Sequence, residues 1–163
     1  MQIFFYLLVA LTFHFNCIGQ TTSNNFNSQK LENDLWRALA DSGKYNDAII
    51  ILLDSLNTSK HKNNHGTYWH VGQLYACNNE YAFALKYIKK STSFFHKLFD
   101  REWRLYYKGT IAFLKKDKEK LKIYNDKLWN KHSDYYYFNA CKLNALYDNF
   151  DKPYLVAYNI TCK

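Results

Sequence analysis

The apolar residues between positions 68 and 88 recur at helical spacing in two segments, which a short polar turn separates. Those that share one helical face are Tyr68, Val71 and Tyr75 in the first segment and Ala84 and Ile88 in the second. The turn between the segments carries two Asn and one Glu. This pattern predicts two antiparallel helices that bury their apolar faces against each other.

A similar pattern recurs along the chain at nearly equal steps. The residues at the equivalent place in four second helices are Ala48, Ala84, Leu121 and Val156, which lie 36, 37 and 35 residues apart. Regular steps of this length are typical of a repeat architecture, in which each unit needs its neighbours to bury its apolar face. We therefore expect eight helices, at about residues 29–42, 45–58, 66–78, 80–97, 100–115, 118–131, 134–148 and 152–161, with Val156 and Ile160 of the last helix facing inward.

The best-formed copy resembles the tetratricopeptide repeat. The residues at the places that define this family are Tyr68, Val71, Gly72, Tyr75, Ala84 and Ile88. Gly72 and Ala84 are small, so we expect the two helices to touch there. The other copies match more loosely, and in the first copy Trp36 stands where the family has Gly. The resemblance implies an all-α domain over residues 29–162, built as a right-handed stack of about four antiparallel helix hairpins, an α-solenoid.

Stacks of this family form a concave groove from the first helix of each hairpin, and the groove commonly takes a peptide or a partner helix. The resemblance places on it Trp69, His70, Gln73 and Cys77 of the second hairpin, and Tyr106, Thr110 and Phe113 of the third. It implies a protein or peptide partner for a module without catalytic activity of its own. Ordinary surface exposure or packing between repeats is the alternative interpretation of each residue.

The first 19 residues have the pattern of an export signal. An apolar run spans residues 3–15, which is too short to cross a bilayer comfortably. Small residues at Cys17 and Gly19 suit a signal peptidase, so we expect cleavage after Gly19, with residues 20–28 as a polar linker. The mature protein would then be periplasmic or secreted, without a stable membrane span, and it resembles exported proteins of the Bacteroidetes. Lipidation of Cys17 and an uncleaved anchor are the alternatives.

Three cysteines remain after such cleavage: Cys77, Cys141 and Cys162. An odd number in an exported protein leaves at least one free thiol or an intermolecular bond. Cys141 and Cys162 fall on the two arms of the last predicted hairpin, so they are the candidate disulfide. Cys77 is expected to be a buried and unreactive thiol.

Composition limits the classes of fold and partner. Five Gly and one Pro in 163 residues are too few for a turn-rich β-sandwich. The net charge is +8, and the excess of basic residues is not uniform. One basic segment carries Lys115, Lys116, Lys118, Lys120 and Lys122. Asp117 and Glu119 alternate with these lysines, which favours a solvated helix face over a binding patch. Nucleic acid is not expected, although Tyr135, Tyr136, Tyr137 and Phe138 follow the basic segment, because an exported protein rarely meets it.

No residue pattern indicates a cofactor, a metal or a catalytic set. His61, His65 and His70 lie close together in the sequence, but their spacing and their Asn neighbours indicate a polar loop rather than a metal site. Two function classes remain beside the interaction module. One is an exported small-ligand binder or enzyme on a helical scaffold, which predicts a deep pocket with convergent polar groups. The other is a structural part of a larger complex.

Overall fold

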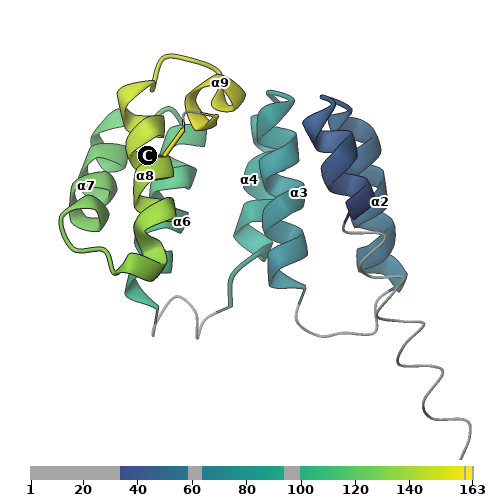
Figure 1. Ribbon diagram of the computed structural model, residues 1–163, viewed down its shortest axis with the longest axis horizontal. Helices are drawn as coiled ribbons and strands as arrows, with labels where there is room; N and C mark the ends of the chain where they lie inside the picture. Colours follow the sequence, from purple (N-terminus) through teal and green to yellow (C-terminus); the bar gives the residue numbers. More distant parts are fainter. Residues whose placement is uncertain (1–33, 59–63, 94–99, 160, 163) are drawn as a thin grey trace, which may run out of the picture.

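The computed structural model describes residues 34–58, 64–93, 100–159, 161 and 162 (Figure 1). These residues form helices and no strand, which confirms the all-α fold class. Residues 34–41 are helical. The elements that follow are α2 (Tyr45–Thr58), α3 (His65–Cys77), α4 (Tyr81–Lys90), α6 (Arg101–Leu114), α7 (Lys118–Trp129), the 3-10 turn η1 (Asp134–Tyr136), α8 (Tyr137–Asp148) and α9 (Tyr154–Tyr158).

Most predicted helices agree with the observed ones within a few residues, but two of them differ more, and residues 94–97 of the first of these two lie outside the described residues. The helix expected over residues 80–97 ends at Lys90, and the one expected over 152–161 is reduced to the five residues of α9. The expected signal peptide (1–19), the linker (20–28) and His61 lie outside the described residues. Among the described helices, none has the length and apolar character needed to cross a membrane.

Three turns between successive helices share one backbone geometry. Gly43, Asn79 and Lys116 have positive φ angles of 77°, 62° and 57°. In each turn the backbone amide of the positive-φ residue donates to the carbonyl oxygen of the residue three positions earlier. The backbone amide of the following residue donates to the carbonyl oxygen of the residue five positions before it. This left-handed cap satisfies the last carbonyls of the helix. Asn79 lies 36 residues after Gly43, and Lys116 lies 37 residues after Asn79, so the turns keep the step of the helices.

Two glycines allow helices to touch. A Cβ atom placed on Gly72 would lie 2.5 Å from Cγ1 of Ile88 and 3.1 Å from the carbonyl oxygen of Ala84. The predicted close contact between α3 and α4 at Gly72 and Ala84 is therefore confirmed. Gly109 has the same role between α6 and α8, because its Cβ would lie 2.5 Å from Cδ1 of Leu143.

The fourth unit departs from the first three. Ala48, Ala84 and Leu121 are completely buried, but Val156 at the equivalent step is 51% exposed. The expectation that Val156 faces inward is wrong, since α9 turns Tyr154 toward the core instead. Tyr154 packs edge-on against Phe113 at a ring-centroid distance of 5.8 Å. Ile160 lies outside the described residues.

The helices pack largely in chain order. Residues of α2 contact α3, α3 contacts α4, α4 contacts α6, and α6 contacts both α7 and α8. The short helix α9 packs on α8 and also reaches α3. Figure 1 shows α9 between the α6–α8 group and the α3–α4 pair, at the end of the molecule where α3 and α8 finish. The last described helix, α9, thus connects α8 with α3, which is distant from it in the sequence.

Trp36 is buried although the repeat that the sequence resembles has Gly at its place. Its side chain is 6% exposed, and its ring lies 5.0 Å from the ring of His70 between centroids. Residues 34–41 and α2 enclose it together with Ile49, Leu52 and Leu74 in a core cluster separate from the larger one around α6. The Trp36 side chain fills the space between the two helices of the first hairpin, which could pack closer together if this residue were Gly.

Candidate functional site

The seven residues that the resemblance places on the groove lie on two helices that face each other, and Cys77, at the end of α3, is described below with the other cysteines. Trp69, His70 and Gln73 are on α3, and Tyr106, Thr110 and Phe113 are on α6. The ring of Trp69 joins the two helices, because its centroid lies 5.3 Å from that of Tyr106 and 4.8 Å from that of Trp103. The α3–α6 interface is therefore an aromatic surface.

Four of the six residues other than Cys77 are buried, and Trp69 and Tyr106 keep only 6% and 2% of their surface exposed, whereas His70 and Gln73 are half-buried. Thr110 and Phe113 have no exposed surface. Thr110 donates through Oγ1 to the carbonyl oxygen of Tyr106 at 3.0 Å, and Phe113 packs against the rings of Phe150 and Tyr154. These contacts give Thr110 and Phe113 packing roles in the core, so we do not carry them into the binding surface proposed below.

A cleft of about 360 Å³ opens at one end of the α3–α6 interface. The residues that line it come from α3, from the end of α4, from the start of α6 and from η1. They are His65, Gly66, Trp69, His70, Ser91, Asp100, Trp103 and Tyr136. The cleft therefore contains two of the predicted residues, Trp69 and His70. It adds Asp100 and Trp103, which the sequence analysis did not single out, and Tyr136, which was considered only for nucleic acid.

Asp100 fixes the geometry of this cleft through two hydrogen bonds. As the N-cap of α6, it accepts through Oδ1 from the backbone amide of Trp103 at 3.0 Å. Its Oδ2 accepts from the hydroxyl of Tyr136. Burial raises the pKa of Tyr136, and the hydrogen bond to the Asp100 carboxylate raises it further. The phenol of Tyr136 is therefore a fixed, uncharged donor at neutral pH.

His70 is the second polar group at the cleft. Its Nδ1 lies 3.3 Å from Oε1 of Gln73. Burial lowers the pKa of His70 below its ordinary value of 6.5, while the contact with Gln73 opposes this shift and the charge of Arg37 adds to it. His70 is consequently neutral at physiological pH, and its ring can offer a donor or an acceptor to a bound group.

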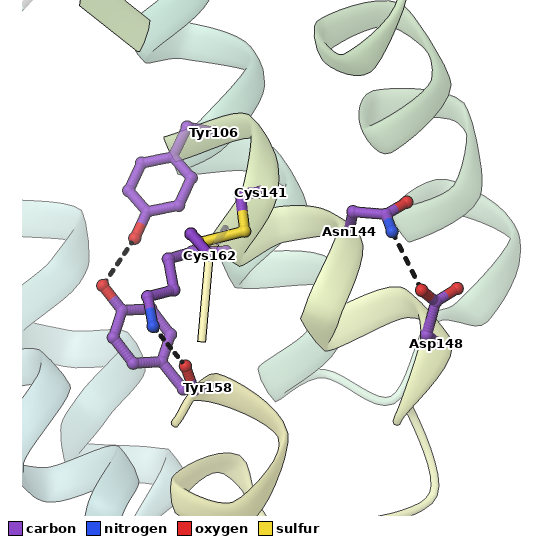
Figure 2. The surroundings of a disulfide bond; sticks show 7 residues. Tyr106, Cys141, Asn144, Asp148, Tyr158 and Cys162 are labelled. Carbon is purple, nitrogen blue, oxygen red and sulfur yellow. Dashed lines mark hydrogen bonds between the residues drawn. A yellow bond between two sulfur atoms is a disulfide. The ribbon is translucent and has the colours of Figure 1, made fainter. Parts of the chain in front are cut away.

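At the other end of the interface, α9 covers Gln73 and Tyr106. Nε2 of Gln73 donates to the hydroxyl oxygen of Tyr158 at 3.0 Å. The hydroxyls of Tyr158 and Tyr106 share a hydrogen bond of 3.1 Å, which Figure 2 shows. The ammonium group of Lys142 donates to the carbonyl oxygen of Tyr158 at 2.9 Å. We call this arrangement of Gln73, Tyr106 and Lys142 the Tyr158 site.

A disulfide joins Cys141 of α8 to Cys162, four residues after the end of α9, with an S–S distance of 2.00 Å (Figure 2). This is the pair that the sequence analysis selects. Cys77 is a half-buried free thiol, and burial raises its pKa to about 11. No group of three or more His, Cys, Asp or Glu side chains suited to a metal ion occurs among the described residues.

Part of the cleft has a recognisable sequence signal. Asp100 stands three residues before Trp103 at the start of an apolar helical pattern, which is the spacing of an N-cap. Tyr136 has no comparable signal, because its approach to Asp100 depends on the fold of η1. No protein-family model, curated protein or solved structure matches this chain.

Proposed function

We propose that this protein is an exported module that binds a protein or peptide partner at the α3–α6 interface, on a scaffold of tetratricopeptide-like helix hairpins, without catalytic activity of its own. Three turns with one hydrogen-bond pattern, spaced by 36 and 37 residues, support the repeat scaffold. The close approach of α3 to α4 at Gly72, where the family also has Gly, supports it as well.

The cleft is the observation that carries the binding proposal. Trp69 and Trp103 form its aromatic wall, with their planes at 60°. Asp100 and His70 supply polar groups beside them. Aromatic residues bury a large area at low entropic cost and are the commonest residues to dominate binding energy at interfaces. A cleft of about 360 Å³ has room for a short peptide segment, which we expect to bind with roughly micromolar affinity.

Export is part of the proposal. The apolar segment before the cut expected after Gly19 supports it, and so does the disulfide between Cys141 and Cys162. Disulfides of this kind persist in the periplasm and outside the cell, whereas cytoplasmic thiols are kept reduced. We therefore propose a periplasmic or secreted location.

The test is capture of a partner by the tagged protein from envelope and culture extracts. Wild-type protein, Trp103→Ala and Ile123→Ala are compared, because Ile123 is 49% exposed on α7, which contributes no residue to the cleft. We expect wild-type and Ile123→Ala to retain the same polypeptide and Trp103→Ala to lose it. Capture that is identical for all three proteins, or absent from all three, would contradict the proposal.

The cleft also favours a second candidate, a small-ligand binder or an enzyme on the same scaffold. Its volume of about 360 Å³ is that of a small-molecule site, since such pockets span about 300–1,000 Å³. This candidate predicts that a small molecule raises the melting temperature of the wild-type protein but not of Trp103→Ala. Such a shift without any captured polypeptide would favour it over the interaction module.

A further inference from the structure

The short helix α9 presents two tyrosines to the rest of the protein. Tyr154 is completely buried, as is Ala157, whereas Val156 is 51% exposed. Tyr154 and Tyr158 lie one helical turn apart, and their rings stack with a centroid distance of 5.1 Å. α9 is thus an amphipathic helix with an aromatic face that is turned toward α3, α6 and α8.

This aromatic face occupies residues that the repeat resemblance assigns to a partner. The hydroxyl of Tyr158 lies between Gln73 of α3 and Tyr106 of α6, at 3.0 Å and 3.1 Å. Both were predicted to contact a bound peptide or helix. In this structure the chain's own C-terminal segment makes those contacts.

Three further contacts hold α9 in place. Lys142 donates to the carbonyl oxygen of Tyr158, and the hydroxyl of Tyr81 accepts from the backbone amide of Tyr154 at 3.1 Å. The disulfide fixes Cys162, just beyond α9, to α8. A helix of five residues is too short to be stable alone in water. Its conformation therefore depends on this packing and on the covalent tether.

We infer that α9 is a resident ligand of the α3–α6 interface, and that this interface accepts from a partner an amphipathic helix with two aromatic side chains four residues apart. The hydroxyl of the second aromatic residue would take the position of the Tyr158 hydroxyl, between Gln73 and Tyr106. The disulfide keeps the resident segment bound, so the partner helix competes with a tethered copy of its own chemistry. This inference rests on the proposed function and names the partner's chemistry at its site.

The disulfide tether strongly favours α9 over a free partner helix at the interface. A linked segment has an effective concentration on the order of millimolar, so a free peptide of micromolar affinity does not displace α9 from the intact protein. Loss of the tether together with loss of the Tyr158 ring removes contacts that hold α9 on the interface, so that a helix carrying both aromatic side chains can replace it. The accessible state is therefore the full chain with Cys141→Ser, Cys162→Ser and Tyr158→Ala.

The probe is a fluorescein-labelled synthetic peptide of residues 151–162 with Ser in place of Cys162, followed by fluorescence anisotropy. We expect it to bind the triple variant at least tenfold more tightly than the oxidised wild-type chain. A matched peptide with Tyr158→Ala should lose that binding. Equal affinity of the peptide for both proteins, or equal binding of the two peptides, would overturn the inference.

A second measurement covers the case in which the triple variant does not fold, as judged by circular dichroism. Cys77 packs against the core cluster that contains Tyr154 and Ala157 of α9. We expect maleimide to modify Cys77 at least tenfold faster in Cys141→Ser/Cys162→Ser than in the oxidised wild-type, read by mass spectrometry of the Cys77 peptide. Unchanged modification would show that the disulfide does not hold α9 down and would overturn the inference.

The two proposals fail separately. The proposed function depends on Trp103 in the cleft, and this inference depends on the Tyr158 site at the other end of the interface. Trp103-dependent capture without peptide binding would overturn the inference and leave the proposed function standing. Peptide binding without any captured polypeptide would overturn the proposed function and with it the partner, although it would show that the Tyr158 site accepts such a helix.

Discussion

Gln73 and Tyr158 are 85 positions apart in the sequence, and the amide of the first donates a hydrogen bond of 3.0 Å to the hydroxyl of the second. This bond brings the C-terminal helix α9 onto α3, across the residues that the repeat resemblance assigns to a partner. The open part of the same interface is then the cleft around Trp69 and Trp103.

The crossing of α3 and α4 predicts a strong effect of one methyl group. Gly72→Ala places a Cβ against Ile88 and against the backbone of Ala84, so we expect a loss of about 1–3 kcal/mol in the free energy of unfolding. Gly66→Ala is the matched control, because a Cβ there meets nothing within 4 Å. Urea denaturation of both variants gives the comparison, and a Gly72→Ala protein as stable as the control would contradict the close crossing.

The buried second-helix position on α7 predicts that substitutions at Leu121 and at Ile123 have different effects on stability. Leu121 is completely buried, whereas Ile123 is 49% exposed on the same helix. Leu121→Ala should cost about 2–5 kcal/mol, and Ile123→Ala should stay within about 0.5 kcal/mol of wild-type. Both values come from chemical denaturation, and equal losses would mean that Leu121 does not occupy the core.

His70 predicts a pH dependence of stability. Its pKa is lowered in the folded protein, first by burial, so the unfolded chain binds the proton more readily. The stability from neutral His70 is complete above the ordinary pKa of 6.5 and is lost as the pH falls through that value toward the folded pKa. The melting temperature should therefore fall more between pH 7 and pH 5 in wild-type than in His70→Gln. Equal falls would exclude His70 as the source.

Cys77 predicts a slow reaction with alkylating reagents. With its pKa raised from 9.0 to about 11 by burial, it holds roughly a hundredfold less thiolate near pH 7.5 than an exposed thiol does. Iodoacetamide should modify Cys77 at least tenfold faster after unfolding in urea than in the native protein. Equal rates, measured by mass spectrometry of the Cys77 peptide, would contradict the burial.

The repeat spacing correctly predicted which second-helix positions are buried in the first three hairpins, because local sequence determines those helices and turns. Ala48, Ala84 and Leu121 are all completely buried, because each second helix follows a turn of the same geometry and meets the same kind of neighbour. Val156 does not follow, since the turn before it has no left-handed residue among those described and α9 has only five residues. The spacing of 35 residues between Leu121 and Val156 gives no sign that the turn before α9 has a different geometry.

The site was predictable in part for the same reason. Gln73 and Tyr106 were placed on one surface by their repeat positions, and the structure brings both to Tyr158. The identity of that third residue could not be predicted, because the family pattern pairs the last helix with its own hairpin and not with α3. Tyr136 was missed because a three-residue 3-10 turn, which has no periodic pattern, carries it to Asp100.

The central claim is that the cleft at the α3–α6 interface binds a polypeptide. Gly66 lines that cleft and has open space at its Cβ, so a photoreactive benzoylphenylalanine in its place samples whatever occupies the cleft. The same residue at position 123, on α7, is the control. The account predicts a covalent adduct with one polypeptide from position 66 in envelope or culture extracts and none from position 123. No adduct from position 66, or the same adducts from both positions, would contradict it.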